Sequence, residues 1–350
     1  MKITLVGPGL MPIPPKGWGA VEILIADQAA MLEAAGHQVT IVNQRDRAQA
    51  LAEVAASQPD LVHLHYDEYI GWAEQMACPR VVATSHYAYL EVFTQWWGLF
   101  RRPKLVAGLR LLRRLLPARL LQGLGCPRPV LAVLSYEPFF RAFLRSRCTL
   151  ICLSPGIAEV YRRFGFRGEI RVCPNGARDD LIRYSQAPAY PDLSVCVGKI
   201  EPRKRQVELA SLQDLRFVGP IVDPRFPKEH PGYLGPWSRE QLFERLTDFG
   251  NLVLLSDGEA HPLVCCEALI AGLGLVVSEP AAANLDRSLP FITVMANAAL
   301  QDHEQVAQAI RHNRRQCLQV GRAAIRDYGL RAFALSTWVQ RYPPLLQEHS

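Results

Sequence analysis

Short apolar runs alternate with amphipathic stretches along almost the whole chain, and this alternation is what most limits how its 350 residues can fold. The pattern is typical of parallel β-sheets whose strands are joined by crossover helices. In the first half we expect strands at 3–7, 38–43, 61–65, 80–84, 130–135 and 150–153. In the second half we expect strands at 193–197, 215–218, 252–255, 275–277 and 292–294. The sequence therefore predicts an α/β protein with two parallel sheets.

The two series of strands are separated by residues 184–191, a polar and proline-rich stretch without periodicity that we interpret as a linker. We place one domain at 1–185 and a second at 186–330. Apolar positions that recur every three or four residues predict helices at 20–35, 203–212, 239–249, 262–271 and 304–314. Because ligands of parallel sheets bind at the C-terminal ends of the strands, we expect a site in the cleft between the domains.

Composition narrows the class of protein further. Charged residues make up 21% of the chain and hydrophobic residues 49%, which is typical of soluble globular proteins. The longest apolar run, 268–277, is far shorter than the roughly 20 residues of a membrane span, and the N-terminus lacks the apolar core of a signal peptide. The nine cysteines lack CxxC spacing and mostly lie in apolar runs, so we expect reduced core thiols, a cytoplasmic protein and no metal site. A net charge of +6 is too modest to indicate nucleic acid.

The strongest candidate site is a pair of carboxylates eight positions apart. Glu259 follows an expected buried strand and a turn, and Glu267 lies in the helix that we expect to begin near Pro262. The free amides of Leu263 and Val264 at the start of that helix form an anion site. On spacing alone, a surface helix with two solvated glutamates explains the pattern equally well.

The segment from Glu259 to Glu267 resembles the E-x7-E motif of retaining GT-B glycosyltransferases, in particular those of family 4. In that family the first glutamate contacts donor-sugar hydroxyls and the second binds the ribose of the nucleotide. The following residues 268–277 resemble the family's EAMACGLPVV continuation. The chain departs from the family at 260–262, where Ala-His-Pro replaces Gly-Phe-Gly or Ser-Phe-Gly. Proline removes one amide donor, so the usual donor preference is not assumed, and we count His261 among the donor-binding residues.

A second motif, residues 197–204, resembles the family's G-R-x-x-x-x-K loop, with Lys199 at the arginine position and Lys204 at the lysine position. Such cations stabilise the negative charge that a departing nucleoside diphosphate gains. Lysine in place of arginine keeps the charge but loses the bidentate geometry. The resemblance also includes the neighbouring Arg203 among the donor-binding residues. The alternative reading of the segment is a basic surface turn.

Three weaker motifs lie in the first half. Residues 7–22 form a Gly/Pro loop in which Pro12 occupies the third glycine position of a dinucleotide fingerprint, so NAD binding is disfavoured. The loop resembles the glycine-rich loop of family 4 enzymes, which implies that Gly17, Gly19 and Glu22 border the acceptor. The segment 84–86 resembles the family's T-x-H, whose histidine, here His86, approaches the transferred sugar; a purely structural histidine is the alternative. Residues 174–176 resemble the family's P-N-G turn near the linker.

Together these motifs imply a GT-B fold, with two Rossmann-like domains whose parallel sheets face a central cleft and a C-terminal segment, 331–350, that crosses back to the first domain. The implied activity is that of a hexosyltransferase-like enzyme that needs no cofactor or metal. It would transfer a sugar, with retention, from a UDP-, GDP- or other nucleotide diphosphate sugar to a glycan, lipid-linked or small-molecule acceptor. The implied catalytic residues are Lys199, Lys204, Glu259 and His86. A non-catalytic nucleotide-sugar-binding protein, an epimerase and a phosphorylase of the same fold remain alternatives.

The region that matches the family least, residues 90–147, is strongly basic. It holds eleven Lys and Arg residues against two glutamates, and aromatic residues at 96, 97 and 100 precede leucines and arginines that alternate at helical spacing. Basic amphipathic helices with aromatics at one end suit an anionic membrane surface. We therefore expect residues 96–119 to bind such a surface peripherally. A core-packing helix with a solvated basic face and a cradle for an acidic acceptor are the alternatives.

Overall fold

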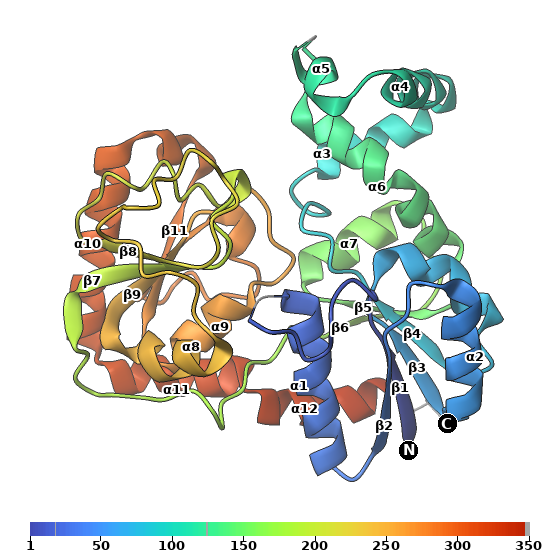
Figure 1. The fold of residues 1–350 in the computed structure, drawn as a ribbon, viewed down its shortest axis with the longest axis horizontal. Coiled ribbons are helices and arrows are strands. Elements are labelled where there is room, and N and C mark those ends of the chain that lie inside the picture. The colour runs from blue at the N-terminus through green and yellow to red at the C-terminus, as the bar shows by residue number, and fades with distance from the viewer. Residues whose placement is uncertain (18, 124, 347–350) are drawn as a thin grey trace.

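The computed structural model describes residues 1–17, 19–123 and 125–346, which form two α/β halves, each built on one parallel sheet (Figure 1). The first sheet has the strand order β2-β1-β3-β4-β5-β6 and the second the order β11-β10-β9-β7-β8. The first contains β1 (Lys2–Val6), β2 (Gln38–Val42), β3 (Leu61–Leu64), β4 (Val81–Thr84), β5 (Thr149–Cys152) and β6 (Ile170–Val172). The second contains β7 (Tyr190–Val197), β8 (Leu215–Val218), β9 (Phe249–Leu254), β10 (Gly274–Ser278) and β11 (Ile292–Met295).

Helices cover both faces of the first sheet. Alternate strand residues such as Val62 and Leu64 pack on one face beneath α2, η1, α6 and α7, whereas Ile3 and Leu5 pack on the other beneath α1 and α12. Burial on both sides explains why these strands are rich in Val, Ile and Leu at successive positions. The helices are α1 (Ala20–Ala34), α2 (Arg47–Ser57), the 3-10 helix η1 (Asp67–Gln75), α6 (Arg128–Arg145), α7 (Pro155–Arg163) and α12 (Leu335–Leu346).

The second sheet is covered in the same way. Leu252 and Leu275 face a core shared with α8, α9 and α11, while Val253 and Val276 face a second core that includes Ile310 of α10. The helices of this half are α8 (Arg239–Arg245), α9 (Leu263–Ile270), α10 (His303–Val320) and α11 (Arg322–Phe333). Short 3-10 turns complete it at η3 (Pro202–Lys204), η4 (Leu246–Asp248), η5 (Glu279–Ala281) and η6 (Asn297–Gln301).

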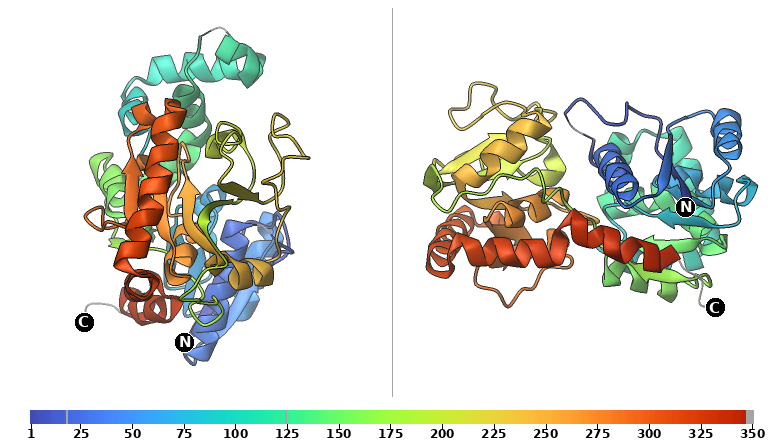
Figure 2. Two further views of the ribbon diagram at one scale, coloured as in Figure 1. Left: turned by 90° about the vertical axis from the view of Figure 1, so that its left-hand side faces the viewer. Right: turned by 90° about the horizontal axis from the view of Figure 1, so that it is seen from below.

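The chain passes between the halves twice. It leaves the first sheet after Val172, enters the second at Tyr190, and returns through α12, which runs beneath the molecule onto the first half (Figure 2). Leu335, Trp338 and Tyr342 of α12 pack in one core with residues of β1 and α1. Residues 347–350 of the expected crossing segment lie outside the described residues.

Two expected elements are wrong. Residues 130–135 are the interior of helix α6 and not a strand, because the short apolar run is the buried face of an 18-residue helix; a run of that length does not distinguish the two by periodicity. Residues 203–212 do not form a helix. The 3-10 turn η3 ends at Lys204, and the left-handed backbone of the following residue, Arg205 (φ 57°), prevents helical continuation.

The basic region forms a group of helices that projects from the first half (Figure 1, top). It consists of α3 (Thr94–Trp97), the 3-10 helix η2 (Gly98–Arg101), α4 (Pro103–Leu115) and α5 (Ala118–Gly123), of which α3 and α4 pack against α6. Trp97, expected at a membrane surface, is instead a core residue: its ring packs on Phe140 and its Nε1 donates to the carbonyl of Leu90 at 2.9 Å. The side chains of Phe100 and Arg119 lie outside the described residues. No helix in the described ranges is long and apolar enough to cross a membrane.

The cysteines are all free thiols, and all except Cys78 and Cys126 are buried.

The packing of α12 predicts the effect of truncating its central aromatic residue. Trp338 is buried and stacks on Tyr342 with 4.5 Å between ring centroids. Trp338→Ala should therefore destabilise the protein by about 3–5 kcal/mol, because it leaves a cavity between α12 and the first sheet. Urea unfolding measures this loss. Leu318→Ala, on an exposed position of α10, is the control and should change stability by about 0.5 kcal/mol or less. Equal effects of the two substitutions would show that α12 is not docked as described.

Candidate functional site

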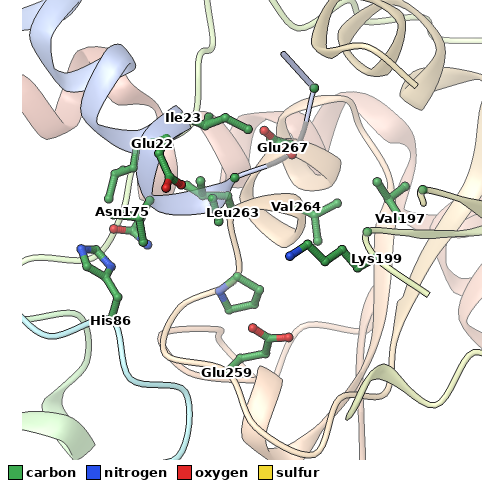
Figure 3. Close-up of a pocket in the computed structure, with 18 of the residues that line it drawn as sticks. Glu22, Ile23, His86, Asn175, Val197, Lys199, Glu259, Leu263, Val264 and Glu267 are labelled. Atoms are coloured by element: carbon green, nitrogen blue, oxygen red, sulfur yellow. The ribbon is translucent and has the colours of Figure 1, made fainter. Parts of the chain in front are cut away.

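A cleft of about 640 Å³ opens between the two halves, at the C-terminal ends of strands from both sheets. It is lined by the loop after β1 and the first turn of α1, by residues after β4, by the loop after β7, and by α9 with the loop before it. The cleft brings together all the residues singled out in the sequence: Gly17, Gly19, Glu22, His86, Lys199, Arg203, Lys204, Glu259, His261, Leu263, Val264 and Glu267. Figure 3 labels seven of them: Glu22, His86, Lys199, Glu259, Leu263, Val264 and Glu267. Residue 18, within the expected acceptor loop, lies outside the described part of the chain.

The loop after β7 brings two lysines to the cleft. Gly198 has a φ of 128°, and a Cβ there would lie 2.7 Å from Nζ of Lys204. Glycine therefore serves two purposes at this position, because it adopts the positive φ and leaves the space that the lysine occupies. The ammonium group of Lys204 lies 4.0 Å from Oε1 of Glu259.

Arg203 organises the carboxylates around the loop. Its Nη1 donates to Oε1 of Glu259 at 2.9 Å and to Oγ of Ser256 at 3.3 Å, and its Nη2 donates to Oε1 of Glu201 at 2.9 Å. The guanidinium is thus bound by two carboxylates of its own half. Its placement favours a role in orienting Glu259 over direct contact with a ligand.

Glu267 is a buried acid in the cleft wall. It lies on α9. The sequence placed Pro262 in the first turn of this helix, but Pro262 is the N-cap and the helix begins one residue later, at Leu263. Burial raises the pKa of Glu267 to about 7; nearby Arg239 opposes the rise and Asp27 adds to it. The side chain is therefore close to half-protonated at neutral pH, and it can either donate a hydrogen bond or accept one.

The N-terminus of α9 supplies unpaired donors. Leu263 and Val264 are the first two residues of this helix and both line the cleft. Amides in a first helical turn have no intrahelical acceptor, and they carry the positive end of the helix dipole. In Figure 3 this helix end lies between Glu259 and Glu267, with Lys199 on the same side of the cleft.

His86 belongs to a cluster of neutral histidines. Its Nε2 lies 3.4 Å from Nδ1 of His65, whose ring lies against that of His63 with 3.7 Å between centroids. Burial lowers the pKa of His86 to about 4 and that of His63 to about 3, so both are uncharged at neutral pH. The amide of His86 donates to Oδ2 of Asp67 at 3.2 Å, which fixes the start of the loop.

His261, expected to bind the donor, is largely committed to the protein. Its ring is buried, and Nδ1 accepts a hydrogen bond of 3.1 Å from the amide of Asn175. The side-chain amide of Asn175 donates in turn to the carbonyl oxygen of His261 at 3.1 Å. Two hydrogen bonds thus join the P-N-G turn of the first half to the loop before α9. A histidine can make the first of these bonds, whereas a phenylalanine at this position could not.

Sequence reasoning missed several residues that hold the halves together. The guanidinium of Arg239 on α8 is bidentate with the carboxylate of Asp27 on α1, with Nη1 2.7 Å from Oδ1. Asn284 donates to the carbonyl of Leu153 at 2.7 Å. Because these partners are more than a hundred positions apart and sit in no motif, a single sequence carries no signal for them. His63 and His65 could have been found from the sequence, because two histidines at alternate positions at the end of an expected strand indicate polar side chains at the cleft.

Among the described residues no group of three or more His, Cys, Asp or Glu is placed to hold a metal ion.

The fold is shared with solved structures of low sequence identity. No protein-family model matches the sequence, and no curated protein matches it. Sucrose-phosphate synthase from Thermosynechococcus elongatus is 16% identical, with a TM-score of 0.69 over 99% of this chain and 98% of that chain. HepE from Anabaena, in complex with UDP-glucose, is 14% identical, with a TM-score of 0.66 over 99% of both chains. WaaG, a glycosyltransferase involved in lipopolysaccharide biosynthesis, is 17% identical, with a TM-score of 0.65 over 99% of both chains. The chain has the GT-B fold.

The raised pKa of Glu267 has a measurable cost in stability. The unfolded chain ionises this carboxyl near its ordinary pKa of 4.5, but the folded chain does so only near 7. Ionisation therefore penalises the folded state increasingly as the pH rises from 4.5 to 7. Glu267→Gln should stabilise the protein by about 2–3 kcal/mol at pH 8 and hardly at all at pH 4.5.

Thermal unfolding at the two pH values measures the difference. Glu244→Gln, at an exposed position of α8, is the control and should give no pH-dependent gain. A gain for Glu267→Gln that is the same at both pH values would contradict the burial of an ionisable group at this position.

Proposed function

We propose that this protein is a metal-independent glycosyltransferase of the family 4 type, which transfers a sugar with retention from a nucleoside diphosphate sugar to an acceptor hydroxyl. One observation carries the proposal: the second half brings two lysines, the free N-terminal amides of α9 and two glutamates to a single cleft, which the first half closes with His86 and Glu22. Separately, each of these features has an ordinary structural explanation. Their convergence on one cleft is what a charged, polyhydroxylated donor requires.

The diphosphate of the donor binds between Lys199, Lys204 and the amides of Leu263 and Val264. All four groups line the cleft, and all carry full or partial positive charge. As the bond between the sugar and the diphosphate breaks, the leaving group gains negative charge. Fixed cations and amides at that position stabilise the transition state more than the bound donor, and this difference is what accelerates the reaction.

The two glutamates bind the neutral parts of the donor. Glu267 accepts hydrogen bonds from the ribose hydroxyls, for which its ionised form is the better acceptor. Glu259, held in place by Arg203, accepts hydrogen bonds from hydroxyls of the sugar, and His86 approaches the sugar from the first half. A neutral histidine suits this position because it can donate or accept without repelling the lysines.

Transfer proceeds on one face of the sugar. The acceptor oxygen forms a bond to the anomeric carbon as the bond from that carbon to the diphosphate breaks, and the electron pair stays on the diphosphate. The proton of the acceptor hydroxyl passes to the departing phosphate oxygen. This route retains the anomeric configuration and needs no covalent intermediate on a protein carboxylate.

Substitutions in the cleft should distinguish residues that act in the chemical step from residues that bind the donor. Lys204→Ala should lower kcat by about 100-fold or more, the scale seen when one preorganised stabilising donor is removed. Glu267→Gln should raise the donor KM far more than it lowers kcat, because the ribose contact barely changes as the sugar leaves. Glu259→Ala should affect both constants and weaken the choice between donor sugars. Steady-state kinetics with UDP-, GDP-, ADP- and dTDP-sugars measures these changes.

The matched control is Lys228→Ala, an exposed lysine outside the cleft, which should leave both constants unchanged. Near-normal transfer by both Lys204→Ala and Glu259→Ala would sink the proposal. Turnover without any acceptor would indicate an epimerase, dependence on free phosphate would indicate a phosphorylase, and binding without turnover would indicate a binding protein.

We also propose that α4 and α5 place the enzyme on an anionic membrane surface. Five leucines of these helices are exposed although they lie at helical spacing: Leu105, Leu111, Leu112, Leu115 and Leu120. The helices project from the body of the protein, so within the described chain nothing covers these leucines (Figure 1). Exposed leucines interleaved with arginines and lysines match the boundary between lipid headgroups and acyl chains. A helix packed in the core would have buried these leucines.

Charge reversal on the projecting helices tests this location. Arg110 is bound to buried Glu137 and holds α4 on α6, so a test should spare it. The triple variant Arg102→Glu, Lys104→Glu and Arg114→Glu should abolish co-sedimentation with vesicles of phosphatidylserine and phosphatidylcholine. Wild-type binding should weaken as salt rises, because screening acts over about 10 Å at 0.1 M.

A triple reversal at exposed arginines of the second half, Arg287, Arg315 and Arg331, is the matched control and should leave sedimentation intact. Equal sedimentation by wild type and both variants would contradict membrane binding through α4.

A further inference from the structure

Glu22 is a buried carboxylate without a protein partner. It is the third residue of α1, only 5% of it is exposed, and it lines the cleft. Among the described residues no hydrogen bond or ion pair to its carboxylate is found. Of the other cleft acids, Glu201 and Glu259 are both bound to Arg203, whereas the carboxylate of Glu267 in the wall of the second half likewise shows no hydrogen bond or ion pair among the described residues. Glu22 is also the one acid that the described residues of the first half contribute to the cleft wall.

The local backbone makes room for this carboxylate. Gly19 has a φ of 135°, and a Cβ there would lie 2.9 Å from Oε2 of Glu22 and 2.6 Å from the sulfur of Met11. A side chain at this position would displace the carboxylate from the cleft. The N-terminal dipole of α1 favours a negative charge in the first turn, but it does not replace hydrogen bonds to the carboxylate oxygens. An ionised group that is nine-tenths buried is costly unless something donates to it.

The surroundings indicate what that donor is. Leu10, Met11 and Tyr66 line the cleft on the same side, and the described first-half residues of the wall include no lysine or arginine. Figure 3 shows Glu22 on the same side as His86 and Asn175, across the cleft from Lys199. The basic groups of the cleft therefore belong to the donor side. The carboxylate of Glu22 is therefore available to accept hydrogen bonds from a ligand bound on the first-half side of the cleft.

We propose that Glu22 binds the acceptor by accepting hydrogen bonds from its hydroxyl groups, so that the acceptor is a neutral, polyhydroxylated molecule such as an uncharged sugar. An acidic group next to the reacting hydroxyl is excluded, because two negative charges would face each other in a largely buried site. The apolar and aromatic wall beside Glu22 complements the C–H face of a sugar ring. This inference rests on the proposed function, since it assigns the second substrate of the same cleft.

Glu22→Gln tests the proposal, and Glu33→Gln, at an exposed position of the same helix, is its matched control. The first measurement is the affinity for UDP, GDP, ADP and dTDP, which should change by less than about two-fold in either variant. The second is the rate at which the best donor reacts with water and with glucose, glucosamine, glucuronic acid and glucose 6-phosphate. Wild type should prefer glucose and glucosamine, which carry no negative charge, over glucuronic acid and glucose 6-phosphate. Glu22→Gln should lower kcat/KM for every hydroxyl acceptor, water included, by about ten-fold or more.

The remaining outcomes are also decisive. An unchanged rate in Glu22→Gln, or a preference of wild type for the acidic sugars, would overturn the proposal. A loss of nucleotide affinity as large as the loss of rate would place Glu22 on the donor side and overturn it as well. Nucleotide affinity in Glu22→Gln also reports whether the variant is folded, and Glu22→Asp, which keeps the charge but shortens the reach, provides a second variant. A wild type that binds no nucleotide would refute the proposed function itself, a result distinct from all of these.

Discussion

A partly buried ion pair between Asp27 of α1 and Arg239 of α8 joins the two halves at the wall of the cleft. Neither half alone holds a complete site, because the lysines and the α9 amides lie on one side and His86 and Glu22 on the other. The pair also sets the electrostatics of the cleft: Arg239 is engaged by Asp27, which limits how far it can lower the pKa of Glu267. This contact thus contributes both to the relative position of the halves and to the pKa of Glu267, which burial raises.

Further contacts fix the end of the cleft that holds Glu259 and His86. The two hydrogen bonds between Asn175 and His261 fix the loop that carries Glu259 relative to the first half. On the first-half side, Asp67 and the histidine cluster fix the backbone of His86. Preorganised groups stabilise developing charge because they need not reorient during the reaction. The buried polar network beneath the cleft is consistent with such a rigid site.

Much of this arrangement could be predicted from the sequence, and the exceptions have physical causes. Strand periodicity predicted the two parallel sheets, since burial on both faces leaves continuous apolar runs. The same reasoning failed at 130–135, where the apolar run is one face of α6, and at 203–212, where a left-handed residue ends the turn. Motif spacing predicted which residues meet in the cleft, but not that Arg203 and His261 bind other protein groups. Contacts such as Asp27 with Arg239 follow only from the packing of the two halves.

The central claim is that the cleft binds a nucleotide through its diphosphate, and thermal unfolding with a series of ligands tests it most directly. Wild-type protein is unfolded with UDP, GDP, ADP or dTDP, and with each corresponding nucleoside. One diphosphate should stabilise the fold by about 2.7 kcal/mol at a hundred times its dissociation constant, while its nucleoside stabilises far less. No stabilisation by any diphosphate, or equal stabilisation by the nucleoside, would contradict the account.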